Sequence, residues 1–200
     1  MRVVIASRND GKIREIKEII KLPGIEFLSY RDFCSWPEIQ ETGNSFRENA
    51  LLKARAIASY FQLPALADDS GLEVDALEGK PGTFSSRYAG EEASDEENNA
   101  KLLRELEGRP VEERTARYGC VAAFADPAGR TLITEGVCEG RIGFGVRGVG
   151  GFGYDPLFIP SGYEKTMAEL SAKEKNRISH RGQAFRRMKG LLGKKPDINP

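Results

Sequence analysis

The first third of the chain alternates short apolar runs with stretches in which apolar residues have helical spacing. The run VVIA at residues 3–6 predicts a buried strand, and isoleucines at 13, 16, 19 and 20 predict a helix after a polar turn over residues 7–11. A second helix is predicted over residues 46–61, with Asn44 and Ser45 as cap candidates and with Asn49 and Lys53 together on one face.

The run LPALA at residues 63–67 predicts a short buried strand whose end leads into Asp68-Asp69-Ser70-Gly71. Open α/β sheets bind ligands at the carboxyl ends of their strands. We therefore expect Asp68 and Asp69 to follow the strand directly and to lie next to a ligand.

The second half of the chain adds a hairpin between two capped helices. A capping box from Ser94 to Glu97 starts a helix through Leu106, and strand-like stretches over 117–125 and 130–139 flank a predicted type I turn at 126–129. A Gly-dense loop over 140–153 and a strand over 156–160 follow. A second capping box, Ser171 to Glu174, starts a helical pattern that ends near residue 192. Without repeats or linkers, residues 1–200 are expected to form a single mixed α/β domain with two lobes.

Composition removes several classes of protein. The 200 residues are 40% hydrophobic and 30% charged, which is typical of globular chains, and 30 Lys and Arg balance 30 Asp and Glu. A protein that neutralises the phosphates of duplex nucleic acid carries a basic excess, so that class is disfavoured. Only four apolar residues occur in a row near the start, and no run approaches 18. We expect a soluble, cytoplasmic protein that binds neither membranes nor nucleic acid.

Cysteine and histidine are too few for most metal centres. Cys34, Cys120 and Cys138 are odd in number and widely spaced, which predicts reduced cysteines rather than disulfides or a zinc ribbon. His180 is the only histidine, so sites that need two are excluded, and a Ser-His-Asp triad would need His180 as its base. Catalysis is expected from carboxylates, lysines and arginines.

The Gly-rich segment contains G-x-G-x-x-G twice, at 143–148 and 148–153. In a dinucleotide-binding fingerprint a helix follows this motif, whereas here Asp155-Pro156 and a strand follow, so that interpretation is rejected. The P-loop sequence is also absent. The segment is interpreted as a flexible loop that ends at Phe152 and Asp155, although glycines also serve purely structural turns.

The first turn has the chemistry of a phosphate site. Ser7, Asn9, Gly11 and Lys12 place a hydroxyl, an amide, open backbone and an ammonium at a helix N-terminus, which favours anions. The alternative is an N-cap followed by a solvated lysine.

Acidic residues further along predict a metal site. Asp68, Asp69 and Ser70 offer the hard oxygen ligands that Mg²⁺ prefers, and Glu41 could add another, although a glutamate in a loop is more often only a solvated charge. The phosphate turn and these carboxylates together point to a nucleotide phosphate substrate.

The C-terminal part is basic, with ten Lys and Arg against three Asp and Glu from Lys165 onward. Most of these charges are interpreted as a solvated helix face. Lys175, Ser179, His180 and Arg181 stand out, because they cluster around a predicted helix start and include the lone histidine.

Six motifs in register resemble the inosine triphosphate pyrophosphatase family, whose members are also called Ham1-like proteins, over residues 3 to about 192. The motifs are Ser7-Arg8-Asn9-Asp10-Gly11-Lys12, Glu41-Thr42-Gly43, Asn49-Ala50-Leu51-Leu52-Lys53-Ala54, Ala67-Asp68-Asp69-Ser70-Gly71-Leu72, Gly150-Gly151-Phe152-Gly153-Tyr154-Asp155-Pro156 and Ile178-Ser179-His180-Arg181-Gly182.

The resemblance implies an α/β fold around an elongated mixed sheet flanked by helices, with the substrate in a cleft between two lobes, and a homodimer. It implies Mg²⁺-dependent hydrolysis of non-standard purine nucleoside triphosphates (ITP, dITP, XTP) to the monophosphate and pyrophosphate. By resemblance, Glu41 and Asp69 bind the metal, and Asp69 is also the catalytic proton acceptor. The implied substrate-binding residues are Ser7, Arg8, Asn9, Asp10, Gly11, Lys12, Lys53, Ser70, Phe152, Gly153, Tyr154, Asp155, Lys175, His180 and Arg181.

Three other functions compete with this hypothesis. A non-catalytic nucleotide sensor would not need Asp69. A related pyrophosphatase would act on modified pyrimidines, and an RNA-binding module would use the basic C-terminal helix.

Overall fold

The computed structural model describes residues 1–193, which form one mixed sheet with helices on its faces. The strands are β1 (Arg2–Ile5), β2 (Glu26–Leu28), β3 (Ala65–Val74), β4 (Thr115–Ala125), β5 (Thr131–Ile142) and β6 (Phe158–Pro160). The helices are α1 (Asp10–Ile19), α2 (Phe46–Phe61), α3 (Asp95–Glu105), α4 (Ala172–Ile178) and α5 (His180–Leu192).

The sheet has the strand order β2-β1-β3-β4-β5-β6. Strand β1 is parallel to both of its neighbours, with Val4 opposite Leu28 on one side and opposite Ala65 on the other, whereas β5 and β6 are antiparallel. The predicted mixed α/β fold is confirmed. Strand β2 was not predicted, because three residues are too few to produce a clear periodic signal.

The chain divides into two compact units. Within the described residues, unit 1 comprises residues 1–69, 121–135 and 182–193, and unit 2 comprises residues 70–120 and 136–181. Strands β3, β4 and β5 each contribute residues to both units. Each unit has a hydrophobic core of its own.

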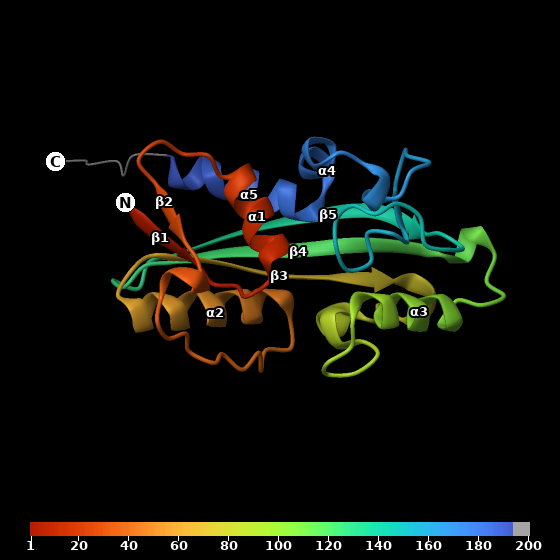
Figure 1. Cartoon of the computed structure of the whole chain (residues 1–200), viewed down its shortest axis with the longest axis horizontal. Coiled ribbons are helices and arrows are strands. Elements are labelled where there is room, and N and C mark those ends of the chain that lie inside the picture. The colour runs from red at the N-terminus through yellow and green to blue at the C-terminus, as the bar shows by residue number, and fades with distance from the viewer. Residues whose placement is uncertain (194–200) are drawn as a thin grey trace. The chain divides into compact units, whose positions relative to one another are not determined.

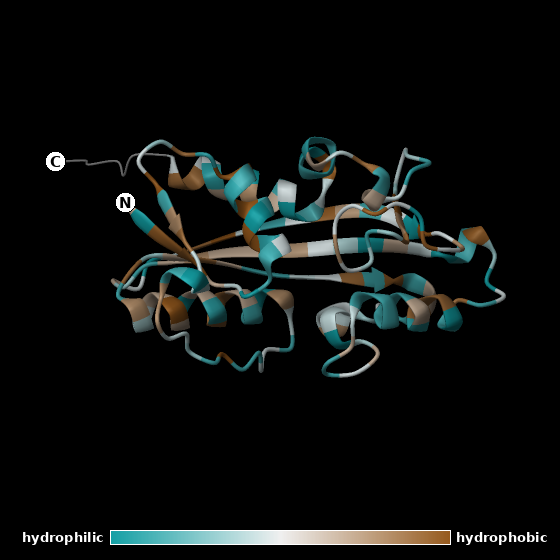
Figure 2. Ribbon diagram, viewed as in Figure 1, coloured by the Kyte–Doolittle hydropathy of each residue, from teal (hydrophilic) through white to brown (hydrophobic). Residues whose placement is uncertain are grey.

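Unit 1 is built around α2, whose apolar face packs on the sheet. Ala50, Ala54 and Ile57 are fully buried in one cluster with Val4 and Ala65. Figure 1 shows α2 on one face of this part of the sheet and α1 on the other, and β1 is hydrophobic over most of its length (Figure 2). Helix α2 covers the predicted residues because Ser45 Oγ accepts a hydrogen bond from Glu48 N and so caps its N-terminus.

The hairpin turn of unit 1 lies where the sequence predicts it. Asp126 N donates to Arg130 O at 3.0 Å, and Gly129 N donates to Asp126 O at 3.1 Å, which closes a four-residue turn between β4 and β5. The 3.0 Å bond from Arg130 N to Asp126 Oδ1 adds a side-chain contact of the kind that favours Asp at such positions.

Unit 2 has a second cluster, in which Leu72 and Val74 of β3 pack with Leu102 and Leu106 from the region of α3. The predicted capping box of α3 is confirmed, since Ser94 and Glu97 exchange side-chain to backbone hydrogen bonds of 3.2 and 2.8 Å.

The predicted strand over 156–160 begins only at Phe158, and two other predicted strand ends are wrong by three residues or more. Strand β3 continues to Val74, so Asp68 and Asp69 lie inside a strand and not after its end, because Leu72 and Val74 extend the buried pattern beyond the polar residues. Strand β5 includes Gly140, where the predicted loop begins, because the missing side chain lets the backbone of β6 approach: a Cβ there would collide with Ile159 O.

The predicted C-terminal helix is two helices. Ser171 caps the first, with its Oγ accepting from Glu174 N at 3.2 Å, but Ser179 has φ −63° and ψ 154°, which is extended backbone, and separates α4 from α5. Within residues 1–193, none of the helices combines the length and apolar composition that a membrane span needs.

Candidate active site

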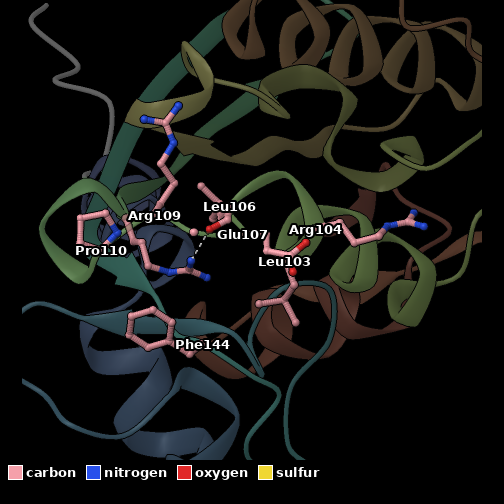
Figure 3. A pocket seen from close by; sticks show the side chains of 9 residues that line it. Leu103, Arg104, Leu106, Glu107, Arg109, Pro110 and Phe144 are labelled. Atoms are coloured by element: carbon pink, nitrogen blue, oxygen red, sulfur yellow. Dashed lines mark hydrogen bonds between the residues drawn. The ribbon is translucent and has the colours of Figure 1, made fainter.

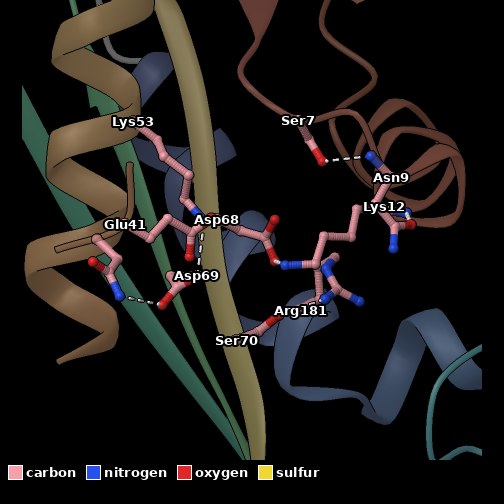
Figure 4. A network of polar contacts seen from close by, with 10 residues as sticks. Ser7, Asn9, Lys12, Glu41, Lys53, Asp68, Asp69, Ser70 and Arg181 are labelled. Carbon is pink, nitrogen blue, oxygen red and sulfur yellow. Dashed lines mark hydrogen bonds and ion pairs between the residues drawn. The ribbon is translucent and has the colours of Figure 1, made fainter. Parts of the chain in front are cut away.

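A buried lysine joins two carboxylates in unit 1. Lys53 Nζ, from α2, lies 2.8 Å from Asp69 Oδ1 on β3 and 3.1 Å from Glu41 Oε1 in the loop before α2 (Figure 4). Lys53 and Asp69 are 8% and 6% exposed, whereas the Glu41 side chain is one-third exposed. The structure thus brings together three residues that the sequence separates by up to 28 positions.

Asn49 is a fourth member of this group. Its Nδ2 donates to Asp69 Oδ2 at 3.3 Å, and its Oδ1 accepts from Gly43 N at 2.8 Å. Asn49 is absent from the predicted site residues, although it lies four residues before Lys53 on the same face of the predicted helix. That i, i+4 spacing is the signal that could have found it.

The surroundings shift the pKa values of this group. Burial raises the pKa of Asp69, Lys53 and Lys12 offset that effect in part, and the Glu41 carboxylate adds to it. Burial by itself would lower the pKa of Lys53, but Asp69, Glu41 and Asp68 outweigh it and raise that pKa. Lys53 therefore stays protonated, while Asp69 binds a proton more readily than an ordinary aspartate.

Asp68 points to the opposite face of β3, as the alternation of a strand requires (Figure 4). Its Oδ2 lies 3.3 Å from Lys12 Nζ, and its side chain is fully buried. The two adjacent aspartates therefore pair with two different lysines, one from α1 and one from α2.

The turn before α1 is held by its own side chains. Asn9 is the N-cap, with its Oδ1 accepting from Lys12 N at 3.0 Å, and Ser7 Oγ accepts from Asn9 N at 3.1 Å. The N-cap interpretation of Asn9 is thus confirmed, whereas Lys12 is not simply solvated, since it pairs with Asp68.

Two further residues of the predicted phosphate turn contact the segment that follows β2. Arg8 donates to Trp36 O at 3.4 Å, and Asp10 forms a 2.6 Å ion pair with Arg31. These contacts involve exposed side chains and tie the turn to its neighbouring loop.

Unit 2 contains the predicted aromatic loop. Asp155 Oδ2 accepts a hydrogen bond from Phe152 N at 2.9 Å and pairs with Lys175 Nζ, with both charged side chains buried. The Lys175 ammonium lies 4.8 Å from the centre of the Phe152 ring. Gly151 has φ +73°, and a Cβ there would collide with Asp155 Oδ2, so this turn requires glycine.

Arg181 and His180 have different surroundings in unit 2. Arg181 is 2% exposed, donates from Nη2 to Ser70 Oγ at 2.7 Å, and has its guanidinium carbon 5.4 Å from the centre of the Phe152 ring. The buried His180 ring stacks on Tyr118, with centroids 4.5 Å apart and planes 10° apart. Arg181 thus contacts the aromatic loop.

Gly153 and Tyr154 attach the same loop to the rest of unit 2. Gly153 N donates to Asp95 Oδ2 at 2.6 Å, and Gly153 O accepts from Asn99 Nδ2 at 3.0 Å, which fixes the loop to α3. Tyr154 is buried and donates to Ser85 O at 2.8 Å.

Two of the cavities in unit 2 differ in how they relate to the predicted site. One of about 390 Å³ lies between α3 and the aromatic loop, and Phe152 and Gly153 line it. Another of about 600 Å³ is lined by Arg104, Arg109 and Phe144 among others and contains none of the predicted site residues (Figure 3).

The donor set fits a magnesium ion only if substrate supplies further ligands. Among residues 1–193, no three His, Cys, Asp or Glu side chains are grouped closely enough to form a metal site by themselves. Glu41 and Asp69 nevertheless place two carboxylates close together, because both pair with the Lys53 ammonium. Because Mg²⁺ in phosphate chemistry typically takes one or two carboxylates plus phosphate oxygens, these two residues fit that role.

The family model described as "Ham1 family" matches residues 3–191. The chain belongs to the Ham1 family. The Ham1-like resemblance drawn from the six motifs is therefore confirmed.

Two relatives support this Ham1 membership over nearly the whole chain. A protein of Geobacter sulfurreducens named dITP/XTP pyrophosphatase is 54% identical over 192 residues, which cover 96% of each chain. A protein of the same name from Desulforamulus reducens is 50% identical over 194 residues, which cover 97% of this chain and 96% of the relative.

Solved Ham1 structures share the fold. The Staphylococcus aureus Ham1 protein is 42% identical, with a TM-score of 0.85, and a HAM1 protein from Coxiella burnetii is 45% identical, with a TM-score of 0.86. Each comparison covers 96% of this chain and 98% of the other. The α/β architecture is thus that of known Ham1 proteins.

Proposed function

We propose that this protein hydrolyses non-standard purine nucleoside triphosphates, such as dITP, ITP and XTP, to the monophosphate and pyrophosphate. The observation that carries the proposal is the group in which the buried Lys53 joins the partly exposed Glu41 to the buried Asp69. A buried carboxylate with a raised pKa, next to an ammonium, offers both a proton acceptor and charge for a phosphate. The names of the relatives, dITP/XTP pyrophosphatase, support this choice of substrates.

Residues of unit 1 are proposed to act on the phosphates. The turn from Ser7 to Lys12 precedes α1, whose N-terminus favours an anion, and Lys12 and Lys53 supply two ammonium groups. Both lysines pair with aspartates of β3, so they are already held in place when the substrate arrives. Preorganised charges of this kind stabilise the negative charge that builds up at the α-phosphorus.

Glu41 and Asp69 are proposed to hold Mg²⁺. When bound, this ion would neutralise charge on the phosphate oxygens. Asp69 would accept the proton of the attacking water, because burial makes it a stronger base than an ordinary aspartate. Lys53 would remain protonated and keep the Asp69 carboxylate in place.

Residues of unit 2 are proposed to bind the purine. Phe152 offers an aromatic face for stacking, and Asp155 and Lys175 hold its loop. Arg181 is a donor, and so suits the C6 keto oxygen of hypoxanthine or xanthine, whereas adenine has an amino donor there. A site built around one hydrogen-bonding edge can reject a mismatched base by as much as roughly 10⁴.

A screen of purine and pyrimidine triphosphates with pyrophosphate detection tests the proposal. We expect pyrophosphate from dITP, ITP and XTP and much slower release from ATP. Detection of the diphosphate as first product would show attack at the γ-phosphate and refute the proposal. Binding without turnover of any triphosphate would instead favour a nucleotide sensor, and preference for modified pyrimidines would favour the related pyrophosphatase.

We also propose that the protein is a homodimer and that it is located in the cytoplasm. Unit 2 exposes three apolar side chains of one loop, Phe144, Val146 and Val149, which a second copy could cover. Analytical ultracentrifugation should then give about twice the 22.1 kDa of one chain, and a monomer at micromolar concentration would contradict the dimer.

A further inference from the structure

We propose that Asn49 is a positioning residue, which orients the Asp69 carboxylate and ties the loop of Glu41 to it. This inference rests on the proposed function, because it assigns Asp69 a role in hydrolysis. Asn49 itself is 2% exposed and uses both ends of its amide: Nδ2 donates to Asp69 Oδ2 and Oδ1 accepts from Gly43 N.

Two side chains of α2 donate hydrogen bonds to the two carboxylate oxygens of Asp69. Lys53 Nζ donates to Oδ1 at 2.8 Å, and Asn49 Nδ2 donates to Oδ2 at 3.3 Å. Residues four apart lie on one face of a helix, so α2 delivers both donors to the same side of β3. Two donors on two oxygens restrict rotation of the carboxylate, which a single ion pair would not do.

The amide oxygen of Asn49, Oδ1, fixes the loop that carries Glu41. Gly43 N donates to Asn49 Oδ1 at 2.8 Å, and a Cβ on Gly43 would lie 2.6 Å from that oxygen and 2.7 Å from Glu48 Cβ. Glycine is therefore required for this close approach. Asn49 thus connects the loop of one carboxylate to the other, while Lys53 joins the two carboxylates directly.

The chain offers a matched control in unit 2. Asn98 of α3 is also 2% exposed, and its Oδ1 likewise accepts from a loop N–H, that of Ala89, at 2.8 Å. Its Nδ2 donates at 3.2 Å to the Ser86 carbonyl instead of a carboxylate. If a buried asparagine serves only the fold, substitutions at Asn49 and at Asn98 should therefore have the same effects on melting temperature and on kcat.

The test compares Asn49→Asp and Asn49→Ala with Asn98→Asp and Asn98→Ala. Asn49→Asp retains an acceptor for Gly43 N but loses the donor to Asp69, whereas Asn49→Ala loses both. Steady-state kinetics on dITP at saturating Mg²⁺, melting temperature, and hydrogen exchange of the Gly43 amide without metal are measured for each variant.

We expect both Asn49 variants to lower kcat at least 10-fold, with KM for dITP changed less than about threefold, because a misoriented group of this kind costs up to 10²-fold in rate. Gly43 exchange should accelerate in Asn49→Ala and stay slow in Asn49→Asp. The Asn98 variants should lower the melting temperature and leave kcat within twofold of the parent.

Parent-like kcat in both Asn49 variants would overturn the inference, as would equal losses of kcat at Asn49 and Asn98. If Asn49→Ala does not fold, Asn49→Asp decides alone: slow Gly43 exchange with lowered kcat supports positioning, and slow exchange with parent-like kcat refutes it. Failure of the parent itself to release pyrophosphate would instead refute the proposed function.

Discussion

Among residues 1–193, two lysine–aspartate pairs have both residues buried, Lys53–Asp69 and Lys175–Asp155, and they differ in what surrounds them. In unit 1, Lys53 pairs with Asp69 and also with a second carboxylate, Glu41. In unit 2, Asp155 pairs with Lys175 and also accepts a hydrogen bond from Phe152 N. In the first group two carboxylates share one ammonium, whereas in the second the Asp155 carboxylate accepts from both an ammonium and a backbone N–H.

This difference separates a chemical role from a conformational one. Surplus negative charge in a group that is proposed to act on phosphates suits a divalent cation and a proton acceptor. A carboxylate shared between an ammonium and a backbone N–H is instead used in holding the shape of a loop. The same two residue types therefore serve, in our interpretation, catalysis in unit 1 and loop construction in unit 2.

The largest expected effect is on the stability of unit 2. Asp155→Asn leaves the buried Lys175 ammonium without its carboxylate, and breaking a buried pair by removing one partner typically costs about 3 kcal/mol or more. Urea denaturation should show this loss, and the double variant Asp155→Asn/Lys175→Met should recover part of it. An unchanged unfolding midpoint would mean that the pair does not hold the loop.

The matching change in unit 1 should affect turnover instead. Asp69→Asn should lower kcat by at least about 10², because the proton acceptor is lost and metal binding suffers. The unfolding midpoint should change less than in Asp155→Asn, since Glu41 remains next to Lys53. If Asp69→Asn retains most of its activity at saturating Mg²⁺, the assignment moves to Asp68.

A smaller effect is expected from removing the Phe152 ring, whose loop is held by the Asp155–Lys175 pair. Phe152→Ala should weaken binding of dITP by about 2 kcal/mol, the size of a typical base–aromatic contact, and should affect free pyrophosphate much less. Competition assays with both ligands measure the difference. Equal losses for dITP and pyrophosphate, with a lower melting temperature, would show that Phe152 only packs the loop.

The smallest expected effect concerns the turn before α1. Asn9→Ala removes the N-cap acceptor for Lys12 N and should cost about 1 kcal/mol of stability. Asn9→Asp keeps an acceptor and should restore that stability, while its added charge should raise KM for the triphosphate. Parent-like KM in Asn9→Asp would argue against phosphate binding at this turn.

The sequence by itself determined the features that depend on neighbours within about four positions. The cap at Ser45, the capping box at Ser94 and the turn after Asp126 were predicted and are present, because each is a hydrogen bond between residues close in the chain. The six motifs also placed the chain in its family, since their order and spacing are properties of the sequence.

Only the tertiary structure decided how the site residues are partnered. Lys12 pairs with Asp68 and Lys53 with Asp69 because successive residues of β3 face opposite sides of the sheet, and α1 and α2 each present a lysine to one of those sides. The stacking of His180 on Tyr118 likewise joins positions far apart in the chain. Sequence pattern cannot specify such contacts, because strand pairing and helix packing bring distant residues together only once the chain has folded.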